Sequence, residues 1–312
     1  MRIFENANFP FHANRRIGLI TSSVLMLVAV VSLIYPGLEA GIDFRGGTEF
    51  VVETAEPVSP TQARSALAPV LGAGTEAKTY GGPTTLLVRT TEGGEIEDVQ
   101  RALVETLEAS FPGAAPAVQR VDSVGPRFAE DLQRGALAAV FGGLLVIFLY
   151  VFIRFDWRFS VGAVLCLAHD VLIVLGLFAL LHEVSPVSMQ IDQTIIAALL
   201  TIVGYSINDT VVVYDRIREY TALFKTKPFE EIVDRGINST LSRTVITSGT
   251  TLLTVFVLFL FGGEVLRGFA LALLVGIGIG TYSSIFVAAP IVVMMRERFP
   301  AKRQTKLVAA RA

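Results

Sequence analysis

The sequence predicts a polytopic α-helical membrane protein with six transmembrane helices and one α+β ferredoxin-like (βαββαβ) domain outside the cytoplasm. The first observation is composition: 52% of the 312 residues are hydrophobic, only 17% are charged, and the mean hydropathy is +0.60. A soluble domain has no use for so much apolar sequence in long runs. The second observation is six apolar stretches long enough to cross a bilayer, and the third is one polar segment between the first two stretches.

The six predicted spans have boundaries that are uncertain by a few residues. They cover residues 17–35, 135–152, 160–181, 194–214, 245–261 and 269–295. Arg15 and Arg16 precede the first span, as they would in a secretory signal. Its apolar run is longer than that of a signal, and no small-residue cleavage site follows, so we expect a retained anchor.

Basic residues predict the orientation of the spans. Most of the 26 Lys and Arg residues lie in the N-terminal segment, the second-to-third and fourth-to-fifth connections and the tail. The two short connections on the opposite side hold only Arg267. By the positive-inside rule, residues 1–16 are a cytoplasmic arm, 296–312 are a basic cytoplasmic tail, and both termini are cytoplasmic. The polar segment, residues 36–134, is then a periplasmic domain of a protein in a bacterial inner membrane.

The periplasmic segment alternates in the manner of a small α+β domain. Predicted strands cover residues 48–54, 77–80, 84–90 and 117–124, and predicted helices cover 59–71 and 95–111. Glycine-rich turns separate these elements, and their order indicates the ferredoxin-like arrangement. The segment has no nucleophile–base pair and no cluster of metal ligands. We therefore expect a binding or lever module that is not an enzyme and needs neither a metal nor a cofactor.

Two glycine-containing joints connect this domain to the membrane spans. Gly46 and Gly47 precede the first strand, and Gly125 and Pro126 precede the second span. They are either tight turns or hinges that absorb a rigid-body motion, and the sequence leaves both interpretations open. Phosphate binding is disfavoured, because no helix is predicted directly after the glycines.

The residue that most narrows the function is Asp209, which lies inside the fourth span. An ionised Asp in the hydrocarbon costs roughly 2.5–3.5 kcal/mol, so such a residue usually marks an ion or proton pathway. Residues Thr194, Ala198, Thr201, Tyr205, Asp209, Val212 and Arg216 recur at helical spacing. We therefore expect this polar face, with Asp209, to point into the bundle.

Arg243 is the predicted partner of Asp209. It opens the fifth span, which runs antiparallel to the fourth, so the two side chains can meet at a similar depth. One interpretation is a static ion bridge that fixes helix packing. The alternative is a proton pathway, favoured by the nearby polar groups of Tyr205, Asn208 and Thr247, which suit bound water.

His169 and Asp170 lie midway along the third span. Adjacent residues point about 100° apart on a helix, so these two side chains need not pair. His169 is either a packing residue or a member of a proton relay. Ala272, Gly276, Gly280, Ser284 and Ala288 form a ladder of small residues that permits close helix packing. Residues 228–241 predict an amphipathic helix at the cytoplasmic interface.

Four motifs together resemble the SecF family, the smaller membrane subunits of the bacterial SecD–SecF accessory complex of the protein-secretion translocon. They are GIDFRGGTE at 41–49, the His169-Asp170 pair, VGYSINDTVVVYDRIRE at 203–219 and SRTVITSGTT at 242–251. The likeness covers nearly the whole chain, including six spans and one outer domain. The string in the fourth span is highly specific, whereas GIDFRGG is shared with SecD.

The resemblance implies a proton-driven subunit, related to the resistance-nodulation-division exporters, that promotes late steps of polypeptide export. It implies that Asp209 and Arg243 are the proton-pathway residues, and that a further essential carboxylate belongs to SecD. The implied partners are SecD, the SecYEG channel, the exported unfolded polypeptide and the lipid bilayer, with YajC as a further candidate and no nucleic acid. We expect a subunit separate from SecD.

Two other functions compete with this interpretation. An exporter of small molecules or lipids would share the membrane carboxylate, but it usually needs a larger outer region with a ligand pocket. A structural assembly subunit would have no titrating group in the membrane. Proton flux, or a titration of Asp209, separates the structural subunit from the transporter.

Overall fold

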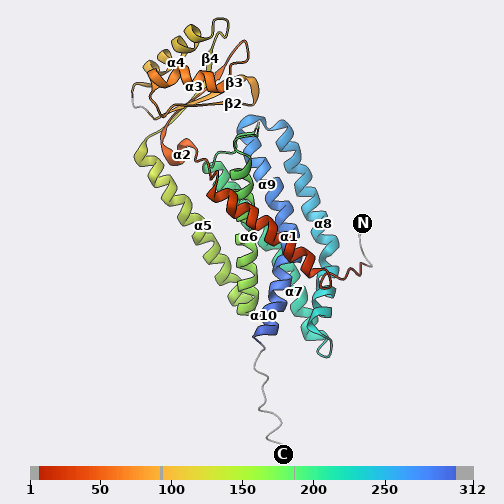
Figure 1. Cartoon of the computed structure of the whole chain (residues 1–312). Helices are drawn as coiled ribbons and strands as arrows, with labels where there is room; N and C mark the ends of the chain where they lie inside the picture. The colour runs from red at the N-terminus through yellow and green to blue at the C-terminus, as the bar shows by residue number, and fades with distance from the viewer. Residues whose placement is uncertain (1–6, 92–93, 186, 300–312) are drawn as a thin grey trace, which may run out of the picture.

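A bundle of long helices lies below a small α+β domain in the computed structural model, which describes residues 7–91, 94–185 and 187–299 (Figure 1). Residues 1–6 of the predicted arm and 300–312 of the predicted tail lie outside the described residues. The elements in chain order are α1 (Arg15–Ile34), α2 (Ile42–Arg45), β1 (Gly47–Glu53), α3 (Pro60–Leu71), β2 (Glu76–Tyr80), β3 (Gly82–Thr90), α4 (Ile96–Ser110), β4 (Ala117–Val124), α5 (Pro126–Arg154), α6 (Trp157–Leu181), α7 (Gln193–Leu223), α8 (Phe229–Phe261), α9 (Gly263–Ser283), the π-helix η1 (Ser284–Ala288) and α10 (Ala289–Arg298).

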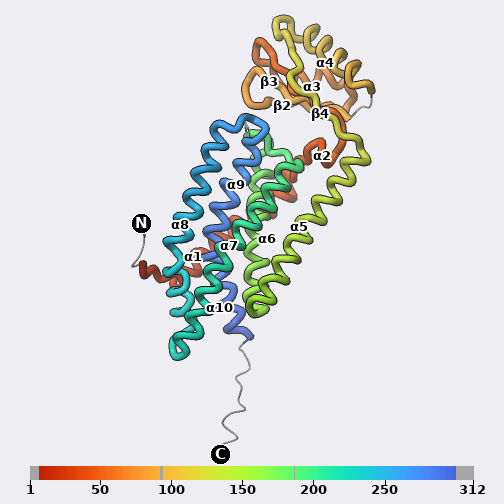
Figure 2. The backbone as a smooth tube through the Cα atoms, turned by 180° about the vertical axis from the view of Figure 1, so that it is seen from behind, coloured from red at the N-terminus to blue at the C-terminus, as the bar shows by residue number. Residues whose placement is uncertain are grey.

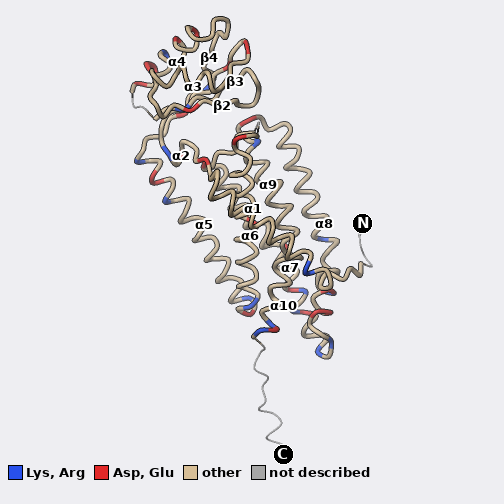
Figure 3. The backbone as a smooth tube through the Cα atoms, in the orientation of Figure 1, with Lys and Arg blue, Asp and Glu red and all other residues tan. Residues whose placement is uncertain are grey.

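Six of the helical segments that the structure describes are long and apolar enough to cross a membrane, as predicted. Charged residues gather in the outer domain and at the opposite end of the bundle, and the middle of the helices is nearly free of them (Figure 3). Helix α5 begins at Pro126, earlier than the predicted start at residue 135, because the chain enters it directly from Gly125. Its span is only 6% buried, and it leans away from the other helices (Figure 2).

The sixth span consists of α9, η1 and α10, so a π-helical turn interrupts the α-helix near its middle. All five members of the predicted ladder, from Ala272 to Ala288, are buried. A Cβ atom on Gly280 would lie 3.0 Å from Ser206 Cβ and 3.5 Å from Asp170 Oδ2. Glycine at this position therefore lets α9 approach α6 and α7 closely.

The prediction of a separate amphipathic helix at the cytoplasmic interface was wrong. Residues 229–261 form one continuous helix, α8, and the amphipathic segment is its first part. Its apolar residues Ile232, Val233 and Ile237 are buried and belong to a core cluster that includes Tyr214 and Ile217 of α7. The apolar face thus packs on protein, and this contact extends the helix beyond the membrane span.

The outer domain is a four-stranded antiparallel sheet in the order β2-β3-β1-β4, covered on one face by α3 and α4. Together with the βαββαβ order, this confirms the predicted ferredoxin-like fold. Phe50 of β1 lies opposite Val88 of β3 and Val121 of β4. The residues that fill the core between sheet and helices are Phe50, Val52, Leu86, Val88, Ala63, Leu67, Leu71, Leu103 and Leu107.

The other face of the sheet is polar and meets the helix bundle through Arg89. Arg89 on β3 lies opposite Glu49 on β1, and its side chain is 4% exposed. Its Nη2 donates to Glu49 Oε2 at 3.0 Å and to Gln190 Oε1 at 2.6 Å, and its Nη1 donates to the carbonyl of Ala40 at 3.2 Å. Because Gln190 belongs to the connection between α6 and α7, this contact attaches the sheet to the bundle.

A second set of bonds continues from Gln190. Its Nε2 donates to Glu39 Oε1 at 2.9 Å, and Glu39 also forms an ion pair with Lys78 of β2. The backbone of Ile191 bonds with Glu39 and Gly41 in a short parallel bridge. We call Glu39, Glu49, Lys78, Arg89 and Gln190 the Arg89 network. It connects the sheet, the linker after α1 and the α6–α7 connection.

Replacing Arg89 by Met should destabilise the protein by about 3 kcal/mol or more, because it leaves the buried Glu49 without its partner. Burial raises the pKa of Glu49 above its ordinary value of 4.5, despite the opposing charge of Arg89. Glu49 has a higher pKa in the folded protein than in the unfolded chain. The free energy of unfolding therefore falls as pH rises from the unfolded to the folded pKa of Glu49. The loss in Arg89→Met should thus be larger at about pH 7 than at about pH 4.

Thermal unfolding of the purified protein across that pH range measures this effect. Arg101→Met is the matched control, because Arg101 forms only an exposed ion pair with Asp98 on α4. Equal pH profiles for the Arg89 and Arg101 variants would contradict the assignment of Glu49 as the group that Arg89 balances.

Candidate functional site

Asp209 lies on α7 inside the bundle and is 2% exposed, so the structure places it where the sequence predicts. Ser248 of α8 donates from Oγ to Asp209 Oδ2 at 3.3 Å. Thr281 of α9 in turn donates to Ser248 Oγ at 2.8 Å. Three helices therefore meet at one carboxylate through a chain of hydroxyl groups.

Arg243 does not form the predicted direct ion pair with Asp209 among the described residues. It does not open its helix, because α8 begins at Phe229, and its side chain is exposed. Ser248, five residues or about 7.5 Å further along α8, occupies the position opposite Asp209.

The second ionisable pair of the spans, His169 and Asp170 on α6, is buried and bonded. His169 Nδ1 lies 2.9 Å from Asp170 Oδ1, so these adjacent side chains do meet, although helix geometry did not require it. Asp170 Oδ2 accepts hydrogen bonds from Ser206 of α7 at 2.6 Å and Ser283 of α9 at 2.9 Å. Asp170 is thus satisfied by donors from two other helices.

Sequence reasoning missed the four hydroxyl residues that surround the two carboxylates: Ser206, Ser248, Thr281 and Ser283. Ser206 and Ser248 stand within the motifs that contain Asp209 and Arg243, but spacing alone did not distinguish them from their neighbours. Thr281 and Ser283 flank the small-residue ladder of the sixth span, which reads as a packing device. In the sequence, these two residues are marked only by their position beside a small residue of the ladder, where a close neighbouring helix can be reached by a hydroxyl group.

The other predicted supporting residues lie at the edge of this site. Tyr205 is half-buried, and its hydroxyl donates to Thr251 Oγ1 of α8 at 3.3 Å. Asn208 is exposed, and Thr247 donates to the carbonyl of Arg243 on its own helix at 2.9 Å. Thr201 is also exposed, so the buried face of α7 is rotated relative to the predicted polar face.

The two predicted joints lie next to each other at one end of the sheet. Gly47 at the start of β1 pairs with Val124 at the end of β4, and a Cβ on Gly46 would lie 3.2 Å from Pro126 Cα. Gly46 and Gly47 have φ values of +74° and +117°, which favour glycine. Gly125 caps α5 and Pro126 is its first residue, so the joint on this side leads directly into a membrane helix.

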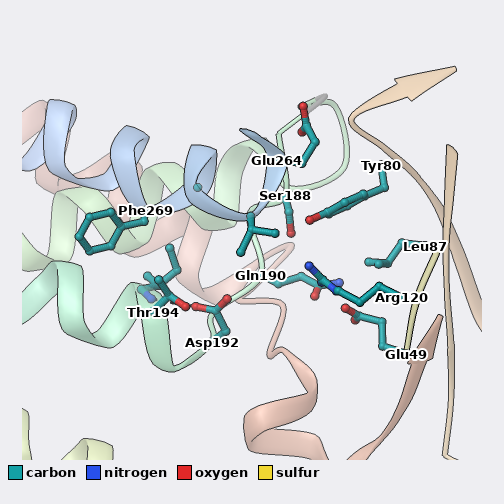
Figure 4. Close-up of a pocket in the computed structure, with 13 residues that line it drawn as sticks. Glu49, Tyr80, Leu87, Arg120, Ser188, Gln190, Asp192, Thr194, Glu264 and Phe269 are labelled. Carbon is teal, nitrogen blue, oxygen red and sulfur yellow. Dashed lines mark hydrogen bonds between the residues drawn. The ribbon is translucent and has the colours of Figure 1, made fainter. Parts of the chain in front are cut away.

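A cavity of about 70 Å³ separates the polar face of the sheet from the bundle (Figure 4). Glu49, Tyr80 and Arg120 line it from the sheet, and Asp192 and Glu264 line it from the bundle. Burial raises the pKa of Tyr80 and of Asp192, which caps the N-terminus of α7 through the amide of Ile195. Tyr80 on the sheet side and Asp192 on the bundle side therefore both favour their neutral forms.

Two family models match the chain. The model described as the C-terminal part of the protein export membrane proteins SecD and SecF matches residues 104–298. The model of the SecD/SecF GG motif matches residues 36–58, which include Gly46 and Gly47.

Curated relatives match over almost the full length. The protein translocase subunit SecF of Rhodothermus marinus is 61% identical over 304 residues, which cover 97% of this chain and 98% of the relative. SecF of Magnetococcus marinus is 42% identical over 95% of this chain and 94% of its own length. The fused subunit SecDF of Thermus thermophilus is 42% identical over 92% of this chain, which matches 39% of that longer protein.

Two solved structures are similar to the chain. The crystal structure of SecDF from Thermus thermophilus, a translocon-associated membrane protein, matches with a TM-score of 0.84 at 39% identity, covering 96% of this chain and 40% of that one. SecDF in a super-membrane-facing form matches with a TM-score of 0.68 at 40% identity, covering 94% and 39%. Because it matches SecF proteins over almost its full length and the SecD/SecF family model over residues 104–298, the chain belongs to the SecF family of protein translocase subunits.

Proposed function

We propose that this subunit works with SecD to use the proton gradient for late steps of polypeptide export across the bacterial inner membrane. The observation that supports this most is Asp209, a carboxyl group buried inside a membrane-spanning bundle and bonded to a chain of hydroxyls. A purely structural ion bridge would need an opposite charge in contact, and Ser248 stands there instead. Hydroxyl groups can both donate and accept, which suits a site that gains and loses a proton.

The proposed orientation has both termini in the cytoplasm and the outer domain in the periplasm. Lys and Arg residues gather at the end of the bundle opposite the outer domain (Figure 3). Arg154 is the last residue of α5, Arg158 is the second residue of α6, and Arg218 and Arg296 lie near the ends of α7 and α10. This distribution agrees with the positive-inside rule.

A polar face on α7 and α8 supports SecD as the partner. Within these spans the exposed side chains include Thr201 and Asn208 of α7 and Arg243, Thr250 and Thr254 of α8. Polar side chains in a span face protein or a water-filled cavity in preference to lipid. The fused relative SecDF contains SecD and SecF in one chain, and this chain matches about two fifths of it. SecYEG, YajC and the unfolded polypeptide are further proposed partners.

The proposed coupling between membrane and periplasm is a tilt of the outer domain. Its two joints, at Gly46-Gly47 and Gly125-Pro126, lie side by side and together form a single stalk. The Arg89 network is a separate contact that must open if the domain tilts. The two SecDF structures match this chain over similar lengths but with TM-scores of 0.84 and 0.68, so their arrangements differ.

Asp209→Asn should reduce export to the level seen without a proton gradient while the complex still assembles. The amide keeps the volume and accepts the Ser248 hydrogen bond, but it cannot titrate. The measurement is polypeptide export into vesicles that contain this subunit, SecD and the translocon channel, with and without the gradient. Asp215→Asn is the matched control, because Asp215 lies on the same helix in an exposed ion pair with Arg154. Full stimulation of the Asp209 variant by the gradient would refute the proposal.

Arg243→Lys should also lower gradient-dependent export in the same assay, by about tenfold or more. Arg243 does not contact Asp209 in this arrangement of the helices, so the proposal requires the two to meet in another one, where a Lys ammonium cannot present the planar donor pair of a guanidinium to the carboxylate. Arg235→Lys is the control, since Arg235 on the same helix pairs with the exposed Glu231 and lies over the ring of Phe224, away from Asp209. If Arg243→Lys and Arg243→Met both export normally, Arg243 has no part in the proton pathway.

Crosslinking the outer domain to the bundle should block stimulated export reversibly. Tyr80 and Glu264 line the same cavity from opposite sides, so cysteines at these positions can be joined by a short reducible crosslinker (Figure 4). Cys166 is first replaced by Ser, which keeps the hydrogen bond to Ser283. Recovery on reduction shows that motion was lost. Undiminished export by a complex whose crosslink is complete on a gel would exclude the tilt.

A further inference from the structure

Asp170 on α6 is the most deeply buried carboxylate in the described residues, with 1% exposure. Its Oδ2 accepts hydrogen bonds from Ser206 Oγ and Ser283 Oγ, and its Oδ1 shares a hydrogen bond with His169 Nδ1. The thiol of Cys166, one turn earlier on α6, donates to Ser283 Oγ at 3.1 Å. This is a complete polar cluster at the centre of an apolar bundle, with contributions from α6, α7 and α9.

The charge of this cluster depends on one proton. In the described part of the chain, His169 is the only basic side chain in contact with Asp170. The Nε2 atom of His169 is buried and has no hydrogen-bond partner among the described residues. With Nδ1 donating to Asp170, Nε2 is the open position: one added proton there, or on the carboxylate, makes the pair neutral overall.

The groups around the pair favour a proton over a metal cation as the ligand. In the middle of the helices packed against α6, the titratable side chains are Tyr205, Asp209 and Tyr214 on α7 and Tyr282 on α9, and Cys166 lies one turn before Asp170 on α6 itself. The apolar parts of α1 and α5 and all of η1 have no charged residue, and the charged residues of α10 stand at its end. The hydroxyls of Ser206 and Ser283 lie 2.6 Å and 2.9 Å from Asp170 Oδ2, at donor distance, and Ser283 can also donate to the carbonyl of Gly280. A cation bound there would require both to turn away.

Asp170 and Asp209 are connected through two helices. On α9, Ser283 donates to Asp170, and Thr281, two residues earlier, donates to the Ser248 hydroxyl that binds Asp209. On α7, Ser206 binds Asp170 and precedes Asp209 by three residues, so both lie on one face. The π-helix η1 begins directly after Ser283, and such turns inside α-helices are frequent at functional sites.

We infer that His169 and Asp170 form a second proton-binding site of this subunit, coupled to Asp209 through Ser206, Ser283, Thr281 and Ser248. A proton that leaves the Asp209 carboxylic acid yields a carboxylate there, and a proton added at the His169–Asp170 pair neutralises that pair. No other bond is made or broken. This inference rests on the proposed function and adds to it a site that holds the proton at a second depth in the membrane.

Infrared difference spectra of the SecD complex in lipid vesicles, recorded between acidic and alkaline buffer, test this inference. A protonated carboxyl group has its own C=O stretching band. We expect Asp209→Asn to remove part of this band, and Asp170→Asn to remove either a different part of it or the imidazole bands that report a proton on His169. Asp234→Asn is the control: Asp234 lies outside the bundle core and accepts from the amide of His12, which an Asn oxygen still does.

The outcomes separate this inference from the proposed function. If Asp170→Asn leaves the spectrum and proton uptake unchanged while Asp209→Asn abolishes stimulated export, Asp170 is only a packing residue and the inference fails alone. If Asp170→Asn does not fold, Ser206→Ala is the second variant, because it keeps the Asp170 carboxyl group and removes one of its hydrogen-bond donors. Ser206→Ala should shift the pH at which the band appears. Thermal stability equal to that of the wild type shows that this variant is folded. An unshifted band in Ser206→Ala overturns the inference.

Discussion

Two carboxyl groups inside an apolar helix bundle are the constraint on which the arrangement of the spans depends. The backbone donors of a helix are used within it, so each buried carboxylate needs donors from neighbouring helices. Asp170 and Asp209 obtain theirs from serines on α7, α8 and α9. A serine side chain is short, so these bonds require close helix packing. Gly280 on α9 provides it, because a side chain there would meet Ser206.

The two faces of the sheet in the outer domain differ in polarity and in what covers them. One face of the sheet is apolar and is covered by α3 and α4, which stabilises the domain by itself. The other contains Glu49 and Arg89, whose charges are buried against the α6–α7 connection. A buried polar contact has strict geometry, so it defines one orientation of the domain on the bundle. If that orientation changes, the groups in this polar contact lose all their hydrogen-bond partners at once. A hydrophobic interface, in contrast, can slide while it stays buried.

The exposed side of α7 and α8 is incomplete in this chain alone. Asn208 and Arg243 are exposed beside an otherwise apolar span, and most of the apolar span of α5 is also exposed. An exposed polar or charged side chain in a span costs free energy in lipid, and contact with protein or water lowers that cost. Arg243 lies on this side, so among the described residues the group in contact with Asp209 across the helix interface is the Ser248 hydroxyl and not a positive charge.

The sequence by itself determined the six spans, the order of strands and helices in the outer domain and the burial of Asp209, because hydropathy and periodicity are local properties of the chain. Only the tertiary structure decided that Ser248 faces Asp209, that His169 meets Asp170 and that residues 228–241 continue into α8. The Arg89 network likewise joins residues far apart in the chain. Such contacts depend on how each helix is rotated and how deeply it lies against its neighbours, and a rotation of one residue, about 100°, exchanges one set of partners for another.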